Sequence, residues 1–172
     1  MIQEIPYAGW KRNLRLRGAI TELVITLDVG PRIIRYAFPE GKNVFVEMAE
    51  QMGGVGETEW MIRGGHRFWT APEGDHSYEL DNGPVTWKKL SGESVEIVQP
   101  ASKKFGFQNT LRVELLAGDV VKVTHLLANT ADHFGIVRRR IDAWARRILR
   151  KIIPPRRVHA LSWDSGKVDK HV

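Results

Sequence analysis

The stretch LRVELLAGDVVKV, residues 111–123, indicates the fold class of most of this chain. Apolar residues alternate with Arg and Glu from Leu111 to Leu115, and the alternation resumes at Val121. A period of two is typical of a strand that buries one face and exposes the other to water. Because Ala117–Asp119 separates the two runs, the stretch predicts a β-hairpin.

Similar runs fill the chain from Arg12 to Asn129, rich in Val, Ile, Thr and aromatic residues and broken at Gly, Pro or Asn. The predicted strand regions are residues 13–18, 19–28, 31–38, 43–47, 77–90, 93–100, 109–118 and 119–129. No helical pattern of useful length interrupts them, so the sequence predicts a mainly β fold, an antiparallel β-sandwich or a large curved sheet. We expect one such domain over residues 1–132.

Composition limits the classes of function. The 172 residues suffice for one domain, and the absence of cysteine excludes disulfides and thiolate metal sites. No apolar run approaches the roughly 18 residues of a membrane span, so we expect a soluble, cytoplasmic protein. The net charge of +6 is local: residues 1–132 carry 15 basic and 17 acidic side chains, whereas residues 133–158 carry nine basic and one acidic.

The basic segment belongs to a second predicted region, residues 133–172. Its apolar residues recur every three or four positions, which predicts a basic amphipathic helix over 136–153. The last fourteen residues are expected to form a loose terminus. Residues 136–158 fit a contact with nucleic acid, an anionic membrane or a partner groove, or a cover for the sheet. A frame-shifted or interrupted gene is a further explanation for so arginine-rich a segment.

The motif RGGHRFWTAPEGDHSY, residues 63–78, is the first candidate site, because its Gly and Pro residues exclude a regular helix. In a ligand-binding interpretation, His66 and Arg67 donate hydrogen bonds to hydroxyls or a carboxylate. Trp69, Trp60 or Tyr78 would then offer a flat apolar face to a sugar ring, and Glu73 is a further candidate for ligand binding.

Three other interpretations of the motif stay open. His66, Glu73, Asp75 and His76 would together hold a metal, or His66 and Glu73 would act as an acid and base pair. In a purely structural interpretation, Phe68 and Trp69 belong to the core, Arg67 pairs with Glu73 and His76 is an exposed loop residue. Side-chain chemistry alone does not decide among them.

Arg32, in DVGPRIIRY, is a further candidate. It either lies on the solvated face of a strand together with Arg35 or binds an anionic or hydroxylated ligand at the mouth of the sheet. Trp10 and Trp87 are expected to pack in the core or against a sheet.

The run from Asn13 to Glu47, the GGHRFWTAPE motif and the run LRVELLAGDVVKVTHLLANTAD together resemble the start of the galactose mutarotase-like, or aldose 1-epimerase-like, β-supersandwich. The likeness is closest to an uncharacterised branch in which a DVGPRI strand precedes a GGHRLW-PE motif, and it covers roughly residues 7–132. It implies half of a supersandwich with sugar-binding Arg and His residues, for which His66 and Arg67 match best and Arg32 less well.

The chain departs from that family after ANTAD, where mutarotases continue into strands that bear a catalytic histidine and a late glutamate base. Here the arginine-rich segment follows, no strand-borne histidine is expected, and the last glutamate is Glu114. The sequence therefore predicts carbohydrate binding through the GGHRFW region without efficient catalysis, and no cofactor or metal. The alternatives are an epimerase whose acid and base come from elsewhere, and an adaptor acting through residues 136–158.

Overall fold

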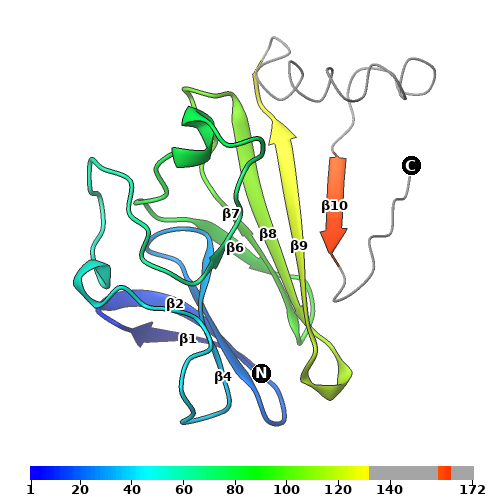
Figure 1. Ribbon diagram of the computed structural model, residues 1–172. Helices are drawn as coiled ribbons and strands as arrows, with labels where there is room; N and C mark the ends of the chain where they lie inside the picture. The colour runs from blue at the N-terminus through cyan, green and yellow to red at the C-terminus, as the bar shows by residue number, and fades with distance from the viewer. Residues whose placement is uncertain (132–158, 164–172) are drawn as a thin grey trace, which may run out of the picture.

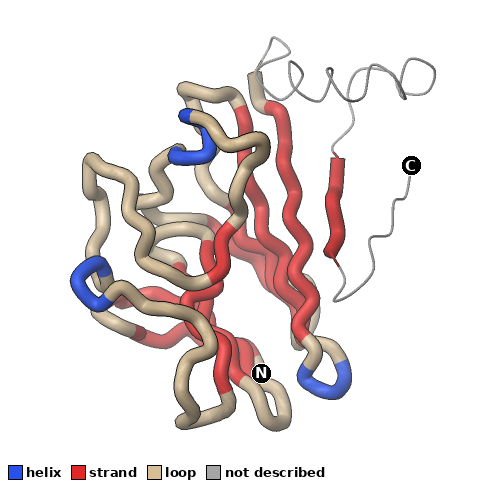
Figure 2. The backbone as a smooth tube through the Cα atoms, viewed as in Figure 1, coloured by secondary structure: helices blue, strands red, loops and turns tan. Residues whose placement is uncertain are grey.

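The structure, a computed structural model, describes residues 1–131 and 159–163, and these are mainly strands joined by loops (Figure 2). The elements in chain order are β1 (Ile2–Tyr7), β2 (Trp10–Arg17), β3 (Glu22–Thr26), β4 (Arg32–Ala37), η1 (Ala49–Gln51), β5 (His66–Arg67), η2 (Asp75–Tyr78), β6 (Thr86–Lys89), β7 (Ser94–Val98), β8 (Phe107–Leu115), η3 (Ala117–Asp119), β9 (Val121–Asn129) and β10 (His159–Trp163).

The strands form two antiparallel sheets, which Figure 1 shows beside each other. One sheet has the order β1-β2-β3-β4-β5 and the other has the order β10-β9-β8-β7-β6. Neighbouring strands are consecutive in chain order, and short turns connect most of them, whereas residues 38–65 separate β4 from β5 and residues 130–158 separate β9 from β10. The prediction of a mainly antiparallel β fold is confirmed.

One apolar core fills the space between the two sheets. The first sheet and its β3–β4 turn contribute Leu14, Leu16, Leu23, Ile25, Leu27 and Ile33, and the second contributes Val95, Ile97, Leu111, Val113 and Leu115. Every second residue of β8 is buried, as the alternation in residues 111–115 predicts. Trp87 packs against this core, whereas Trp10 is buried in a second cluster with Val24, Val29 and Ile34.

The predicted hairpin at Ala117–Asp119 is confirmed and also ties the sheets together. The Asp119 carboxylate accepts hydrogen bonds from the backbone N–H groups of Ile20 and Thr21 and from the Thr21 hydroxyl, at 2.8 to 3.2 Å. These bonds, the Thr21 hydroxyl first, hold the pKa of Asp119 below its usual range. The β8–β9 turn of one sheet is thereby attached to the β2–β3 turn of the other.

Two predicted strand regions are not strands over their full length. In residues 43–47 only an isolated bridge forms, between Glu47 and Gly64. Beside β4, the Asn43 amide oxygen accepts from the backbone N–H of Tyr36 and its nitrogen donates to the Ile34 carbonyl, and the Val44 N–H donates to the Tyr36 carbonyl. Residues 77–90 hold the end of η2 and a loop, and only Thr86–Lys89 is a strand.

The sequence analysis missed β1 altogether. Its burial pattern follows no regular alternation, and Pro6 lies within it. Proline lacks the N–H that a central strand needs, but an edge strand tolerates it, and β1 is the edge of its sheet.

The C-terminal predictions fall mostly beyond the part of the chain that the structure covers. The predicted helix over 136–153 lies wholly outside the described residues. Of the fourteen residues expected to be loose, His159–Trp163 form β10, which pairs antiparallel with β9 from His159 opposite Leu127 to Trp163 opposite Val123. Within residues 1–131 and 159–163, no helix is long and apolar enough to cross a membrane.

Candidate functional site

The two glycines of GGHR let the motif lie against β4. A Cβ at Gly64 would come within 2.0 Å of the Val46 carbonyl oxygen, and one at Gly65 within 2.5 Å of the Ile33 carbonyl oxygen. Both glycines also have positive φ, +94° and +73°, which side chains rarely adopt. The close approach allows β5 to pair with β4, with Arg67 opposite Arg32.

Arg32 is completely buried and holds the segment before β5. Its guanidinium donates to the carbonyl oxygens of Ile62 (2.6 Å) and Gly64 (2.9 Å) and forms a 2.6 Å ion pair with Asp81. Asp81 is only 5% exposed. Arg32 thus lies neither on a solvated face nor at an open mouth, and it joins β4, the motif and the loop that follows η2.

A second buried arginine, Arg63, joins the loop before β5 to the loop after η2. Its guanidinium donates to the Glu57 carboxylate at 2.5 Å, to the Asn82 amide oxygen at 3.0 Å and to the Gln51 carbonyl oxygen at 3.0 Å. The ion pair with Arg63 holds the pKa of Glu57 below its usual range. The loops around residues 51–63 and 79–82 are therefore anchored by buried charge.

The motif divides its side chains between two faces, because successive residues of an extended segment alternate. His66 and Phe68 face β9, where both contact His125. Arg67 and Trp69 face the other way and both contact Trp60. The structure therefore brings Arg67 and Trp69 together but sets His66 apart from them.

Arg67 lies against two neighbouring tryptophan rings. Its guanidinium carbon is 5.2 Å from the Trp60 ring centre and 4.9 Å from that of Trp69. Nε and Nη1 are buried without a hydrogen-bond partner, and the described residues form no ion pair with this side chain. Burial lowers the pKa of Arg67, but an arginine guanidinium stays protonated in proteins. Arg67 thus holds charged N–H donors that no described residue accepts a hydrogen bond from.

Trp60, Trp69 and Tyr78 form an aromatic cluster above Arg67. The ring centres are 5.2 to 5.8 Å apart and the planes are nearly perpendicular, the favoured edge-to-face arrangement. Trp69 and Tyr78 are 37% and 42% exposed, so Trp69 is not a core residue. The Tyr78 hydroxyl donates to Glu73, which raises the pKa of Tyr78.

His66 and His125 form a pair of neutral imidazoles between β5 and β9. Their Nε2 atoms are 3.0 Å apart, so one ring donates and the other accepts. Burial lowers both pKa values, that of His125 to about 4, with the neighbouring His66 as a smaller cause. Nδ1 of His125 is buried without a partner.

The unpartnered nitrogen indicates which tautomer each ring adopts. A proton on Nδ1 of His125 would be a buried donor with no acceptor, whereas a proton on Nε2 leaves only an unused lone pair there. We therefore assign Nε2 of His125 as the donor and Nε2 of His66 as the acceptor. His66 then carries its own proton on Nδ1.

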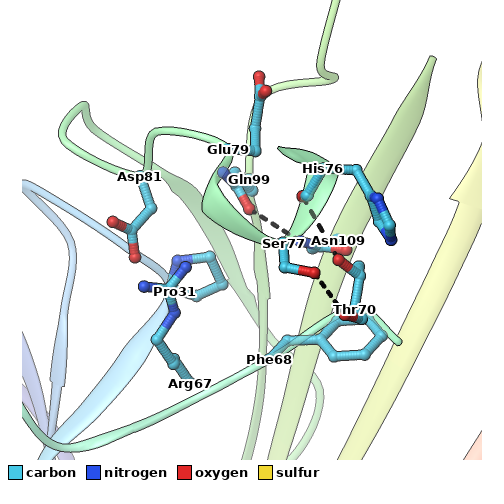
Figure 3. Close-up of a pocket in the computed structure, with 10 residues that line it drawn as sticks. All are labelled: Pro31, Arg67, Phe68, Thr70, His76, Ser77, Glu79, Asp81, Gln99 and Asn109. Carbon is cyan, nitrogen blue, oxygen red and sulfur yellow. Dashed lines mark hydrogen bonds between the residues drawn. The ribbon is translucent and has the colours of Figure 1, made fainter. Parts of the chain in front are cut away.

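A small cavity lies between the motif and the second sheet (Figure 3). Its volume is about 10 Å³, which corresponds to a single water-sized group. Polar side chains dominate its lining. The lining includes Arg67, Thr70, His76, Ser77, Glu79, Asp81, Gln99 and Asn109.

The structure does not form the contacts that the alternative interpretations of the motif require. Within the described ranges no three His, Asp or Glu side chains gather to hold a metal, so the four-residue metal cluster is not formed. Glu73 accepts from Tyr78 and His66 contacts His125, so these two do not form the proposed acid and base pair. Arg67 packs against Trp60 and Trp69 instead of pairing with Glu73, and His76 is half-buried beside Phe105.

Two further residues at the site, His125 and Asp81, are not among those that the sequence predicts. His125 occupies an inward position of β9, opposite the core residue Leu111, where the alternation calls for an apolar side chain. A histidine at such a position is a signal that could have identified it. Asp81 gave no comparable signal, because a loop aspartate is common and its partner Arg32 is 49 residues away. The expectation that no strand-borne histidine follows ANTAD is also wrong, since β10 begins at His159.

Comparison of the chain with models of protein families, with curated proteins and with solved structures finds no match.

Replacing Asp81 with Ala is expected to lower the free energy of unfolding by about 3–5 kcal/mol, because it leaves the buried Arg32 charge unpaired. Urea denaturation measures this change. Glu114→Ala, which removes the carboxylate of an exposed pair with Lys122, is the matched control and should cost at most about 1 kcal/mol. Equal effects of the two substitutions would contradict a structural role for the buried pair.

The His125 pKa predicts a pH dependence of stability. The folded value of about 4 lies below the usual 6.5, so the native state resists protonation of this ring. Its contribution to stability is complete above pH 6.5 and is lost as the pH falls from about 6.5 toward about 4. Unfolding free energies measured across this window should fall more steeply for the wild type than for His125→Gln. Parallel curves would show that His125 titrates normally.

Proposed function

We propose that the protein binds a carbohydrate or carbohydrate-like ligand through the GGHRFW region, without efficient catalysis. The observation that carries this proposal is Arg67, which holds unsatisfied charged donors beneath the partly exposed Trp69. Flat aromatic faces beside a few fixed polar groups are the usual composition of a site for a polar small molecule.

The ligand would rest on the aromatic cluster. A cavity of about 10 Å³ is too small for a sugar ring, so the ring lies outside it, on the exposed faces of Trp69 and Tyr78. Arg67 is an obligate donor and suits hydroxyl or carboxylate oxygens. Glu73, exposed at the rim beside Tyr78, supplies an acceptor for ligand hydroxyls.

The other two candidate residues take different parts in this proposal. Arg32 supports the site from below, because its guanidinium is engaged with Asp81 and two backbone carbonyls. His66 faces β9, apart from the aromatic cluster, so it positions the motif through its contact with His125 and does not touch a ligand on the cluster. The likeness of the DVGPRI and GGHRFW motifs to the mutarotase-like family supports the carbohydrate class, and two antiparallel sheets are compatible with half of its supersandwich.

A mutarotase-type epimerase is the second candidate, favoured by the contact between His66 and His125. Opening a hemiacetal needs both a base and an acid within reach of the sugar. No carboxylate joins the two imidazoles within residues 1–131, and the pair is turned away from the aromatic cluster. Binding without efficient turnover is therefore the better supported function. An adaptor role through residues 136–158 concerns residues outside the described part, and no observation favours it.

Replacing Arg67 with Ala is expected to weaken sugar binding by about 1.5–3 kcal/mol, or roughly 10- to 150-fold, because charged hydrogen bonds to the ligand are lost. Calorimetric titration with common aldoses measures the affinity. Arg67→Lys should recover only part of it, because an ammonium lacks the planar fork of arginine. Arg112→Ala, on the outer face of β8, is the control and should bind as the wild type does. Unchanged affinity in a folded Arg67→Ala protein removes Arg67 from the site.

Polarimetry on freshly dissolved α-glucose and α-galactose tests the absence of efficient catalysis. The purified protein is expected to give no mutarotation above the buffer rate, because a lone histidine contributes at most about 10² to 10⁴ in rate and lacks its partner base. A rate that rises in proportion to protein and disappears in His66→Ala would establish the epimerase instead.

A further inference from the structure

Three side chains around the small cavity each have a polar atom without a hydrogen-bond partner. They are Arg67 with Nε and Nη1, Asp81 with Oδ1, and Asn109 with Oδ1. Asp81 and Asn109 are only 5% and 8% exposed. Buried polar groups are nearly always paired, so three orphans around one space indicate that a group is bound there.

The other atoms of the same side chains are firmly held. Asp81 uses Oδ2 for Arg32, at 2.6 Å, and Asn109 uses its Nδ2 for the Gln99 amide oxygen, at 3.2 Å. Ser77, which also lines the cavity, donates to the Thr70 carbonyl oxygen at 2.8 Å. These hydrogen bonds hold the side chains that line the cavity, and Oδ1 of Asp81 and Oδ1 of Asn109 take no part in them.

We propose that this cavity is a subsite for one hydroxyl group, filled by a water molecule in the free protein and by a hydroxyl of the bound ligand in the complex. Figure 3 shows Arg67 and Asp81 on one side of the cavity and Asn109 with Ser77 on the other. A hydroxyl there accepts from the Arg67 guanidinium and donates to an oxygen of Asp81 or Asn109.

The charges around the cavity select this chemical class. An anion would accept from Arg67 but would face the unpaired oxygens of Asp81 and Asn109. A cation would suit those oxygens but would face the Arg67 charge. Only a group that both donates and accepts satisfies the two kinds of orphan, and a volume of about 10 Å³ admits one such group.

The ligand part of this proposal rests on the proposed carbohydrate binding, since Arg67 lines the cavity and also contacts the aromatic cluster. A sugar on Trp69 would direct one hydroxyl past Arg67 into the cavity. A site built to bond one hydroxyl rejects an analogue that lacks it, because the buried groups are then left unpaired. The subsite would therefore determine which hydroxyl of the sugar must be present.

The first experiment needs no sugar. A high-resolution crystal structure of the free full-length protein should show one ordered water in the cavity, within hydrogen-bond distance of Arg67 and of Asp81 or Asn109. An empty cavity, or a rearrangement in which Arg67 and Asp81 bond each other directly, overturns the proposal.

The second experiment compares methyl glucoside and methyl galactoside with their monodeoxy derivatives by calorimetric titration. For a parent glycoside that binds, one derivative should lose roughly 10- to 150-fold in affinity while the others lose much less. Equal binding of all derivatives overturns the ligand part of the subsite while carbohydrate binding stands. Binding of no glycoside rejects the proposed function, and the crystallographic water then decides the subsite alone.

Asn109→Leu removes one acceptor and keeps Arg67 and Asp81. It should reduce the discrimination between the parent glycoside and the sensitive deoxy derivative, whereas Asn129→Leu, the same change at an exposed position of β9, should leave it unchanged. Urea denaturation of both variants shows that they are folded. Full discrimination in a folded Asn109→Leu protein excludes Asn109 from the subsite.

Discussion

The buried ion pair between Arg32 and Asp81 is the interaction on which the candidate site depends. Arg32 is fully buried, and its remaining donors hold the carbonyl oxygens of Ile62 and Gly64. Two buried charges are expensive to desolvate, so they persist only where the geometry and additional hydrogen bonds compensate. The pair fixes the loops on both sides of β5, and these loops carry every residue of the aromatic cluster.

The position of each site residue follows from the Arg32–Asp81 pair and the loops that it holds. With the loops fixed and β5 paired to β4, strand alternation sends Arg67 and Trp69 to one face and His66 and Phe68 to the other. The first face gathers charged donors under exposed aromatic rings, and the second brings His66 to His125. The small polar cavity lies where Asp81, Arg67 of the motif and Asn109 of the second sheet meet.

The strands around residues 111–123 were predictable because alternation of apolar and charged residues reports directly which face is buried. Residues 43–47 show where that reasoning fails, since the Asn43 side chain makes two of their hydrogen bonds to β4 and no regular strand forms. The GGHRFW motif was recognised as the candidate site, but its division between two faces needed the register of β5. The burial of Arg32 depends on Asp81, a contact between distant residues that no local pattern reveals.

The central claim is that the loops around β5 are part of the rigid fold. Native-state amide hydrogen exchange tests it most directly, at the N–H groups of Gly30, bonded to Asp81, Gly56, bonded to Asn82, and Gly65, bonded to Val46. If the buried charges hold these loops, the three amides exchange with opening free energies close to those of β8. Exchange near the unprotected rate at these amides, with β8 still protected, would show that the loops open independently and would contradict the account.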